Sequence, residues 1–197
     1  MEFGPLDDPL EILVRFREHA EADGLPLPES MVLSTVGLDG TPDARVVFWR
    51  GRDGRKLHFF TNYESRKGRE LEASGRAHLL FHYAAHERQV RVTGSVSRLT
   101  AEQSDAYFEA RARPSQIGAW ASLQSQPLDS RQTLEDRVRE FEKRFEGAPV
   151  PRPPHWGGYG VLAESVEVWI GQVGRLHDRG VYSARSDGGW DFRRLYP

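Results

Sequence analysis

The sequence predicts a mainly β fold with inserted helices, an α+β protein built as one domain over residues 1–197. Short runs rich in β-branched and aromatic residues alternate with turn signals, which is typical of strands joined in hairpins. Helical periodicity occurs only at the start and in the middle of the chain, and no βαβ alternation indicates a parallel sheet. Rossmann, P-loop and α/β-hydrolase motifs are absent from the sequence. An antiparallel, Greek-key-like barrel of about six or seven strands is therefore expected.

The first half of the chain begins with a helix and continues in hairpins. Residues 8–23 carry apolar residues at helical spacing, with Pro9 in the first turn, and predict an amphipathic helix over about 9–23. Asp-Gly followed by Pro at 39–42 is a hairpin signal between two β-rich runs, and a second turn follows at 51–54. The pattern then predicts a strand at 56–63, a short helix at 65–75, and strands at 76–84 and 88–99, the last bending at Gly94.

The second half alternates helices with a loop and closing strands. Helical patterns return at 100–111, where Thr100 and Gln103 resemble a capping box, and at 130–145. Residues 113–127 between them are poorly periodic and predict a functional loop or a short helix. Residues 147–160, rich in proline and glycine, predict a stiff connection, and closing strands are expected at 161–171, 179–186 and 189–195.

Composition excludes several classes of protein. Apolar residues make up 38% and charged residues 28%, as in soluble globular proteins, and no stretch approaches the roughly 20 apolar residues of a membrane span. The acidic start does not resemble a secretory signal, so a cytoplasmic location is expected. The absence of cysteine excludes disulfides and thiolate chemistry. A net charge of −2 argues against a nucleic-acid partner.

Nearly all of the basic residues are arginines, whose planar groups suit phosphate and carboxylate ligands. A biased composition would explain this as well, so position must decide which arginines matter. Arg45 lies on an otherwise apolar strand and needs a partner. That partner is either a bound anion or an acid of the chain, such as Asp43 or Glu87.

A second basic segment follows a predicted strand directly. Ser65, Arg66 and Lys67 open a predicted helix, where a hydroxyl, two cations and free backbone N–H groups can meet an anion. Taken alone, the same segment is typical of a solvated helix start.

Three histidines, His78, His82 and His86, recur every four residues. On a helix this spacing would align three imidazoles for a metal ion. The surrounding residues predict a strand, a turn and a strand, where the interval does not bring the side chains together. We therefore expect no metal site.

Six segments, in order and at similar intervals, resemble the pyridoxine/pyridoxamine 5'-phosphate oxidase family. They are ARVVFWR, FFTNYESRKGREL, ERQVRVTG, YFEARARPSQIGAWASLQSQ, PPHWGGY and VEVWIGQVGRLHDR, with RRLYP at the end. The resemblance implies an FMN-binding split β-barrel that works as a homodimer, with one FMN in each of two clefts at the subunit interface. It also implies oxidation of pyridoxine or pyridoxamine 5'-phosphate to pyridoxal 5'-phosphate, with O₂ as electron acceptor and H₂O₂ as product.

The resemblance also assigns cofactor contacts. The residues that match the family's contacts to the FMN phosphate are Arg45, Ser65, Arg66 and Lys67. Those that match contacts to the ring and the ribityl chain are Val46, Val47, Phe48, Arg50, Phe60, Thr61, Gln89, Gln124 and Ser125. Two further contacts, Trp169 and Arg179, are expected to come from the other subunit. The amides suit the donor and acceptor edge of a flavin. Ordinary surface positions for the polar residues, and a core position for Trp169, are the alternatives.

Substrate contacts are implied in the same way. Arg50, Tyr107, Arg111 and Ser115 match the family's phosphate set, and Arg175 and His177 match the R-L-H motif that lies over the pyridine and positions its C4' carbon. Tyr107 and Arg111 are four residues apart on one helical face, so both can reach one anion. The alternative for His177 is a structural role beside Asp178.

Two departures leave the substrate open. Arg50 stands where the family usually has lysine, and residues 170–174 differ from the family's polar, glycine-rich segment. A related flavin oxidase of another aromatic ring, as in phenazine biosynthesis, and a non-catalytic flavin-binding or pyridoxal-phosphate-binding module are the alternatives.

Overall fold

The computed structural model describes residues 3–197, so Met1 and Glu2 of the predicted domain lie outside the described residues. The helices are α1 (Pro9–Ala22), α2 (Arg66–Ser74), α3 (Ala101–Glu109), α4 (Arg113–Ala121) and α5 (Arg131–Arg144), with short 3₁₀ turns η1 (Ala84–His86) and η2 (Val173–Arg175). The strands are β1 (Ser30–Val36), β2 (Pro42–Phe48), β3 (Arg52–Asp53), β4 (Lys56–Asn62), β5 (Arg76–Tyr83), β6 (Arg88–Arg98), β7 (Trp156–Ile170), β8 (Asp178–Ala184) and β9 (Trp190–Leu195). The predicted α+β class is confirmed, and the nine strands include the two-residue β3, which raises the count above the six or seven expected.

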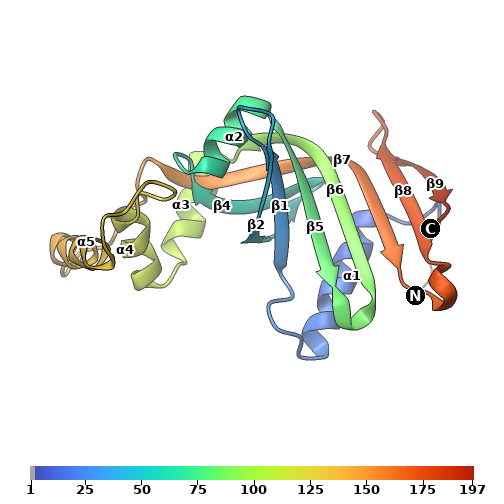
Figure 1. The fold of residues 1–197 in the computed structure, drawn as a ribbon, viewed down its shortest axis with the longest axis horizontal. Coiled ribbons are helices and arrows are strands. Elements are labelled where there is room, and N and C mark those ends of the chain that lie inside the picture. Colours follow the sequence, from blue (N-terminus) through green and yellow to red (C-terminus); the bar gives the residue numbers. More distant parts are fainter. Residues whose placement is uncertain (1–2) are drawn as a thin grey trace.

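All the strand pairs are antiparallel, in the order β2-β1-β5-β6-β7-β4-β3, with β8 on β7 and β9 on β8. The sheet curls so that β2 comes close to β4 (Figure 1). Strand β7 pairs with β4 over its first half and with β8 over its second half. The barrel is therefore split along β7, and the β8–β9 hairpin lies at the opposite end of the molecule from α4 and α5 (Figure 1).

The bend predicted at Gly94 is confirmed. The pairing of β6 with β7 shifts register between Thr93 and Gly94. A Cβ atom at Gly94 would lie 1.8 Å from the carbonyl oxygen of Leu162, so the two backbones meet more closely than any side chain allows.

A stiff connection was predicted for the proline- and glycine-rich residues 147–160, and this prediction is wrong for residues 156–160. Strand β7 begins within it, at Trp156, and its first residues pair with β4. The glycines suit this pairing because a Cβ at Gly157 would lie 2.0 Å from the Tyr63 hydroxyl and one at Gly160 2.4 Å from Lys56. Glycine here gives space for neighbouring side chains rather than a turn.

The helices begin and end where their capping residues predict. Asp8 caps α1, Ser65 caps α2, and Gly75 closes α2 in the left-handed region. Thr100 and Gln103 form the predicted capping box of α3. Of the two options for 113–127, residues 113–121 form a short helix, α4.

Two apolar cores position the site. The first fills the barrel and includes Leu13 and Phe16 of α1. The second joins α3, α4 and α5 to the start of β7, through Phe108, Phe141 and Trp156. The helical layer is thereby held beside β4, where it forms one wall of a cleft. Over residues 3–197, each helix is too short or too polar to cross a bilayer.

Candidate active site

A cleft of about 720 Å³ lies between β2, β4 and the helices α2, α3 and α4, within the usual size range of small-molecule sites. The predicted site residues that line it are Arg45, Val46, Val47, Phe48, Arg50, Phe60, Thr61, Lys67, Tyr107, Arg111, Ser115 and Gln124. The sequence reasoning missed Asn62, Ala112, Gly118, Ala119, Ser122 and Trp156 as lining residues. Several segments that are distant along the chain therefore meet in one place.

Flat apolar groups form much of the cleft wall. The Phe60 and Tyr107 rings stack with centroids 3.8 Å apart, and the Trp156 ring lies nearly parallel to both, at 5.7 Å from Phe60 and 6.2 Å from Tyr107. Across from them, Val46 and Phe48 of the edge strand β2 are 65% and 38% exposed. Such surfaces suit a planar ring. Trp156 could have been found from the sequence, because it lies in the PPHWGGY segment.

One cationic group of the cleft is centred on Lys67. Its Nζ donates to Gln124 Oε1 at 2.9 Å and lies 3.4 Å from Ser65 Oγ, and Thr61 also contacts Gln124 at 3.2 Å. Burial, together with the nearby charge of Arg45, holds the pKa of Lys67 below its usual range. An anion at this point would stabilise the charged form. Ser65 itself is buried as the α2 cap, beneath Lys67.

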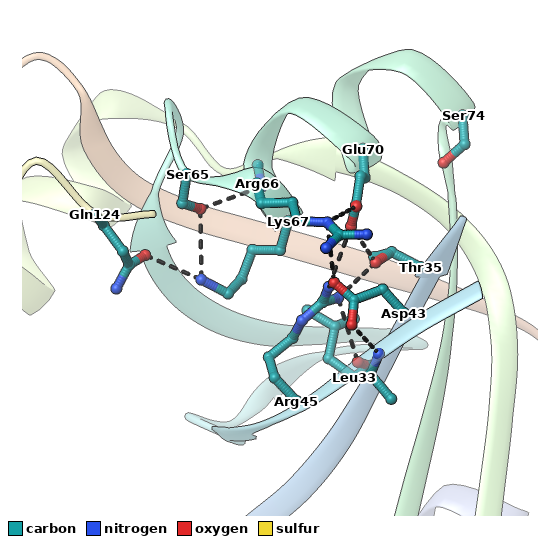
Figure 2. Close-up of polar contacts among 12 residues, drawn as sticks. Leu33, Thr35, Asp43, Arg45, Ser65, Arg66, Lys67, Glu70, Ser74 and Gln124 are labelled. Atoms are coloured by element: carbon teal, nitrogen blue, oxygen red, sulfur yellow. Dashed lines mark hydrogen bonds and ion pairs between the residues drawn. The ribbon is translucent and has the colours of Figure 1, made fainter. Parts of the chain in front are cut away.

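Arg45 lines the cleft, and the ion-pair partners that it has in this structure are acids of the chain. Its Nη2 lies 2.7 Å from Asp43 Oδ2 and 3.1 Å from Glu70 Oε2 (Figure 2). Arg66 turns its Nε to the same two carboxylates, at 3.2 Å from Asp43 and 2.8 Å from Glu70. Glu87, the other acid considered for Arg45, instead lies at the β5–β6 turn.

The sequence reasoning missed Glu70, whose side chain is only 4% exposed. Burial alone would raise its pKa, but hydrogen bonds from Thr35 at 2.5 Å, from Arg66 and from Arg45 hold it below the usual value. The carboxylate therefore stays charged and ties α2 to β1 and β2.

The other cationic group lies at the junction of α3 and α4. Arg111 stacks over the Trp156 ring at 4.6 Å, and its Nη1 is buried without a hydrogen-bond partner. Burial lowers its pKa, an effect that Tyr107 opposes and Arg50 increases. A buried donor without a partner costs free energy, so this position suits a bound anion. Arg50 beside it pairs with Glu29 at 3.5 Å.

Five other predicted residues lie outside the cleft lining, where β6, β7 and β8 meet and in the turn before β8. Gln89, Trp169 and Arg179 are neighbours across β6, β7 and β8, and His177 packs on Trp169 with ring centroids 4.6 Å apart. Arg175 is exposed, with φ +63°, in the turn before β8. None of these five lines the cleft of its own chain.

His177 is held by a backbone hydrogen bond, and Ser125 lies outside the cleft lining. His177 Nδ1 accepts a hydrogen bond from the Gln172 backbone N–H at 3.1 Å, whereas Asp178 pairs with Arg194 at 2.8 Å. The hydrogen bond from Gln172 and the packing on Trp169 agree with the alternative of a structural His177, although Asp178 pairs with Arg194 instead. Ser125 follows Gln124 with φ +71° and is exposed at the rim.

The three histidines at 78, 82 and 86 do not share one helix face, because His78 and His82 lie on β5. His86 instead lies 2.9 Å from Asp23 and stacks on His19 at 4.7 Å, a grouping that the sequence reasoning missed. Arg88 donates to Nδ1 of His19 at 2.8 Å, which places the proton of a neutral His19 on Nε2, toward Asp23. That arrangement does not favour a metal ion, and the absence of a metal site stays a prediction.

Comparison with known proteins agrees with this geometry. Residues 18–145 match the family described as pyridoxamine 5'-phosphate oxidase, and residues 156–197 match the pyridoxine 5'-phosphate oxidase C-terminal dimerisation region. The pyridoxine/pyridoxamine 5'-phosphate oxidase of Rubrobacter xylanophilus is 52% identical over all of this chain and 90% of its own. That of Myxococcus xanthus (strain DK1622) is 51% identical over 96% of this chain and 92% of its own.

Solved structures share the fold. PhzG from Burkholderia lata 383, in complex with tetrahydrophenazine-1-carboxylic acid, has a TM-score of 0.92 and 29% identity, covering 100% of this chain and 98% of its own. A pyridoxamine 5'-phosphate oxidase-related, FMN-binding protein from Nostoc punctiforme has a TM-score of 0.76 and 15% identity, covering 100% of both chains, and supports the fold alone. Sequence and fold together place the chain in the pyridoxine/pyridoxamine 5'-phosphate oxidase family of oxidoreductases.

Proposed function

We propose that the chain is an FMN-dependent homodimer that oxidises pyridoxamine 5'-phosphate or pyridoxine 5'-phosphate to pyridoxal 5'-phosphate. O₂ is the electron acceptor and H₂O₂ the second product. The observation that carries the proposal is one cleft with flat apolar walls and two separate cationic groups, Lys67 with Arg45 and Arg111 with Arg50. Two phosphorylated aromatic molecules, a cofactor and a substrate, match this pattern of charge and shape.

The residues present fit FMN. Lys67 is partly desolvated, and its hydrogen bonds within residues 3–197 go to neutral oxygens, so a phosphate is a suitable counter-ion for it, with Arg45 nearby in the same cleft. The exposed apolar edge of β2 provides packing for the flavin ring, and Gln124 provides an amide at its polar edge. When bound, FMN supplies hydride acceptance and the reduction of O₂.

The other cationic group fits the substrate phosphate. Arg111 offers its buried, unpartnered Nη1, and Tyr107, Ser115 and Arg50 lie around the same part of the cleft. These groups fix the pyridine relative to the flavin, which is the main catalytic contribution that the chain itself makes. With the alcohol, C4' loses a hydride and the hydroxyl loses a proton, which gives the aldehyde. With the amine, C4' loses a hydride and the nitrogen loses a proton, and water then hydrolyses the resulting imine to the aldehyde and ammonia.

We assign Arg175 and His177 to the cleft of the partner subunit. Both lie outside the cleft of their own chain and within the segment that matches the dimerisation region. Arg175 is exposed and free to reach across an interface. In the dimer, the arginine orients the C4' substituent and the histidine hydrogen-bonds to the substrate, while Trp169 and Arg179 approach the flavin.

The direct test is turnover by the purified, FMN-loaded protein. Pyridoxamine 5'-phosphate and pyridoxine 5'-phosphate, the two vitamers, are each incubated with the protein under air. Pyridoxal 5'-phosphate and H₂O₂ are both measured. We expect equal amounts of the two products, with formation depending on O₂. No turnover with either vitamer would remove the substrate assignment.

A second candidate is oxidation of another aromatic ring. It is favoured by the likeness to PhzG, by Arg50, and by the altered segment at 170–174. The phosphate set of Tyr107, Arg111 and Ser115 counts against it, because a substrate without phosphate does not need these residues. Turnover of a reduced tricyclic aromatic carboxylate in preference to both vitamers would support this second candidate. Flavin that stays oxidised in anaerobic mixtures with every candidate substrate would instead indicate a non-catalytic module.

A further inference from the structure

Asp43 lies between the two arginines that are assigned to the flavin phosphate. Its Oδ2 is 2.7 Å from Arg45 Nη2 and 3.2 Å from Arg66 Nε (Figure 2). A carboxylate oxygen that contacts two guanidinium groups makes the contacts that a phosphate oxygen would make with the same pair. The position that favours a phosphate is thus partly neutralised by the chain itself.

Asp43 is not needed to hold either arginine in place. Arg45 also donates to Thr35 Oγ1 at 2.5 Å and to Glu70 at 3.1 Å. Arg66 is held by Glu70 at 2.8 Å. Removing the Asp43 carboxylate therefore leaves both guanidinium groups with a fixed partner.

The two acids differ in how freely they can move. The Glu70 side chain is 4% exposed and that of Asp43 is 29% exposed. Glu70 is held by three hydrogen bonds, whereas Asp43, beyond the two arginines, accepts within residues 3–197 only from the Ala44 N–H, at 2.8 Å. Asp43 is thus a carboxylate at the surface that can turn toward solvent when another anion arrives.

We propose that Asp43 competes with the flavin phosphate for Arg45 and Arg66 and so weakens FMN binding. This inference rests on the proposed function, because it takes FMN as the ligand. Two anions cannot share both arginines without repulsion, so the phosphate must displace the carboxylate or bind beside it at a cost. The residue at this position then sets how tightly the subunit retains its cofactor.

The test is a flavin titration of the full-length apoprotein, followed by quenching of flavin fluorescence. FMN and riboflavin, which lacks the phosphate, are each titrated into the wild type, Asp43→Asn and Asp43→Ser. Removing one charge contact near the surface should tighten FMN binding about fivefold or more in both variants. Riboflavin binding should stay unchanged, because no phosphate competes.

Asp39→Asn is the matched control. Asp39 precedes the same strand and accepts from the Thr41 N–H at 3.0 Å; its charge acts on Arg66 through space, without the close ion pair that Asp43 makes. Its FMN affinity should stay near that of the wild type. An unchanged or weaker FMN affinity in the Asp43 variants, or an equal gain in Asp39→Asn, would overturn the competition. A wild type that binds FMN no better than riboflavin would instead overturn the proposed function.

Discussion

At the scale of single residues, Arg111 is the most informative position in the cleft. Its Nη1 is buried without a partner, so a bound phosphate gains a charge-assisted hydrogen bond there. Arg111→Gln should raise KM for the phosphorylated substrates roughly tenfold to a hundredfold. It should leave the slow turnover of unphosphorylated pyridoxamine unchanged. Steady-state kinetics with both substrates measures the difference.

Arg131→Gln serves as the control for that change, because Arg131 is exposed on α5 and pairs with Glu135. Its kinetics should match the wild type. Equal losses with phosphorylated and unphosphorylated substrates in Arg111→Gln would show that the arginine acts on folding or on flavin rather than on the substrate phosphate.

Residue chemistry explains why some of the site could be predicted and some could not. Arg45 is a cation on an apolar strand, a position that demands a partner whatever the fold, and Lys67 was predicted from its place at the start of a helix that directly follows a strand. Glu70 gives no such signal, because in the segment RKGRELEAS it has the character of a solvated helix residue. Its burial depends on α2 packing against β1, which is a tertiary contact. Asp43 was foreseen as an ion-pair partner of Arg45, but its second contact, with Arg66, was not.

At the scale of elements, the bend of β6 depends on glycine, which has no side chain, at position 94. Gly94→Ala would place a methyl group against the backbone of β7, so it should destabilise the fold by about 3 kcal/mol or more. Gly118→Ala is the matched change, because nothing lies within 4 Å of its Cβ position in α4. That variant should gain about 0.5–1 kcal/mol from helix propensity. Urea unfolding of both variants tests the opposite signs.

The contact of α2 with the sheet should depend on pH through Glu70. Its folded-state pKa lies below its ordinary value of 4.5, so the stabilisation is fully present above about pH 4.5 and is lost as the pH falls through the folded-state value. Glu70→Gln should therefore cost about 2 kcal/mol at pH 7, and the difference from the wild type should narrow at acid pH. Urea unfolding at several pH values measures this difference.

Glu140→Gln, at an exposed position on α5, is the control, and its curve should follow the wild type across the pH range. A Glu70→Gln difference that stays constant with pH would contradict the assigned charge. The other carboxylates titrate in both proteins and cancel in the comparison.

Element boundaries followed from local signals where capping residues and turn residues act alone. The caps at Asp8, Ser65 and Thr100 are examples. The start of β7 could not be predicted, because its glycines give a local preference for a loop. They form a strand only because the side chains of β4 and its neighbours need the space.

At the scale of the whole molecule, the predicted residues form two groups, and the proposed dimer brings them together. Arg111→Gln damages the cleft, and His177→Ala damages the group that we assign to the partner's cleft. Co-refolding the two variants in equal amounts would make half of the dimers hybrids. In each hybrid, one of the two sites has both residues intact. We expect about a quarter of the wild-type activity from the mixture, well above that of either variant alone.

No recovery in the mixture would contradict the assignment of His177 to the partner's cleft. Mixing Arg111→Gln with a Lys67→Met variant is the matched control, because both changes lie in the same cleft and leave every hybrid site damaged. The dimer and the cytoplasmic location stay predictions. The barrel class could be predicted from the hairpin pattern, because each turn signal is local.

Strand β7 separates the two tryptophans that matter most. Trp156 begins the strand and Trp169 lies one residue before its end, a path of roughly 40 Å if it were straight. A ligand of nucleotide size cannot touch both ends of such a span, so in the proposed dimer each polypeptide contributes to two reaction chambers. A change to Arg175 or His177 in one chain would then disable the neighbour's chamber rather than its own. In dimers that form at random from changed and unchanged chains, each unchanged chain completes one cleft, so activity would fall in direct proportion to the fraction of unchanged chains.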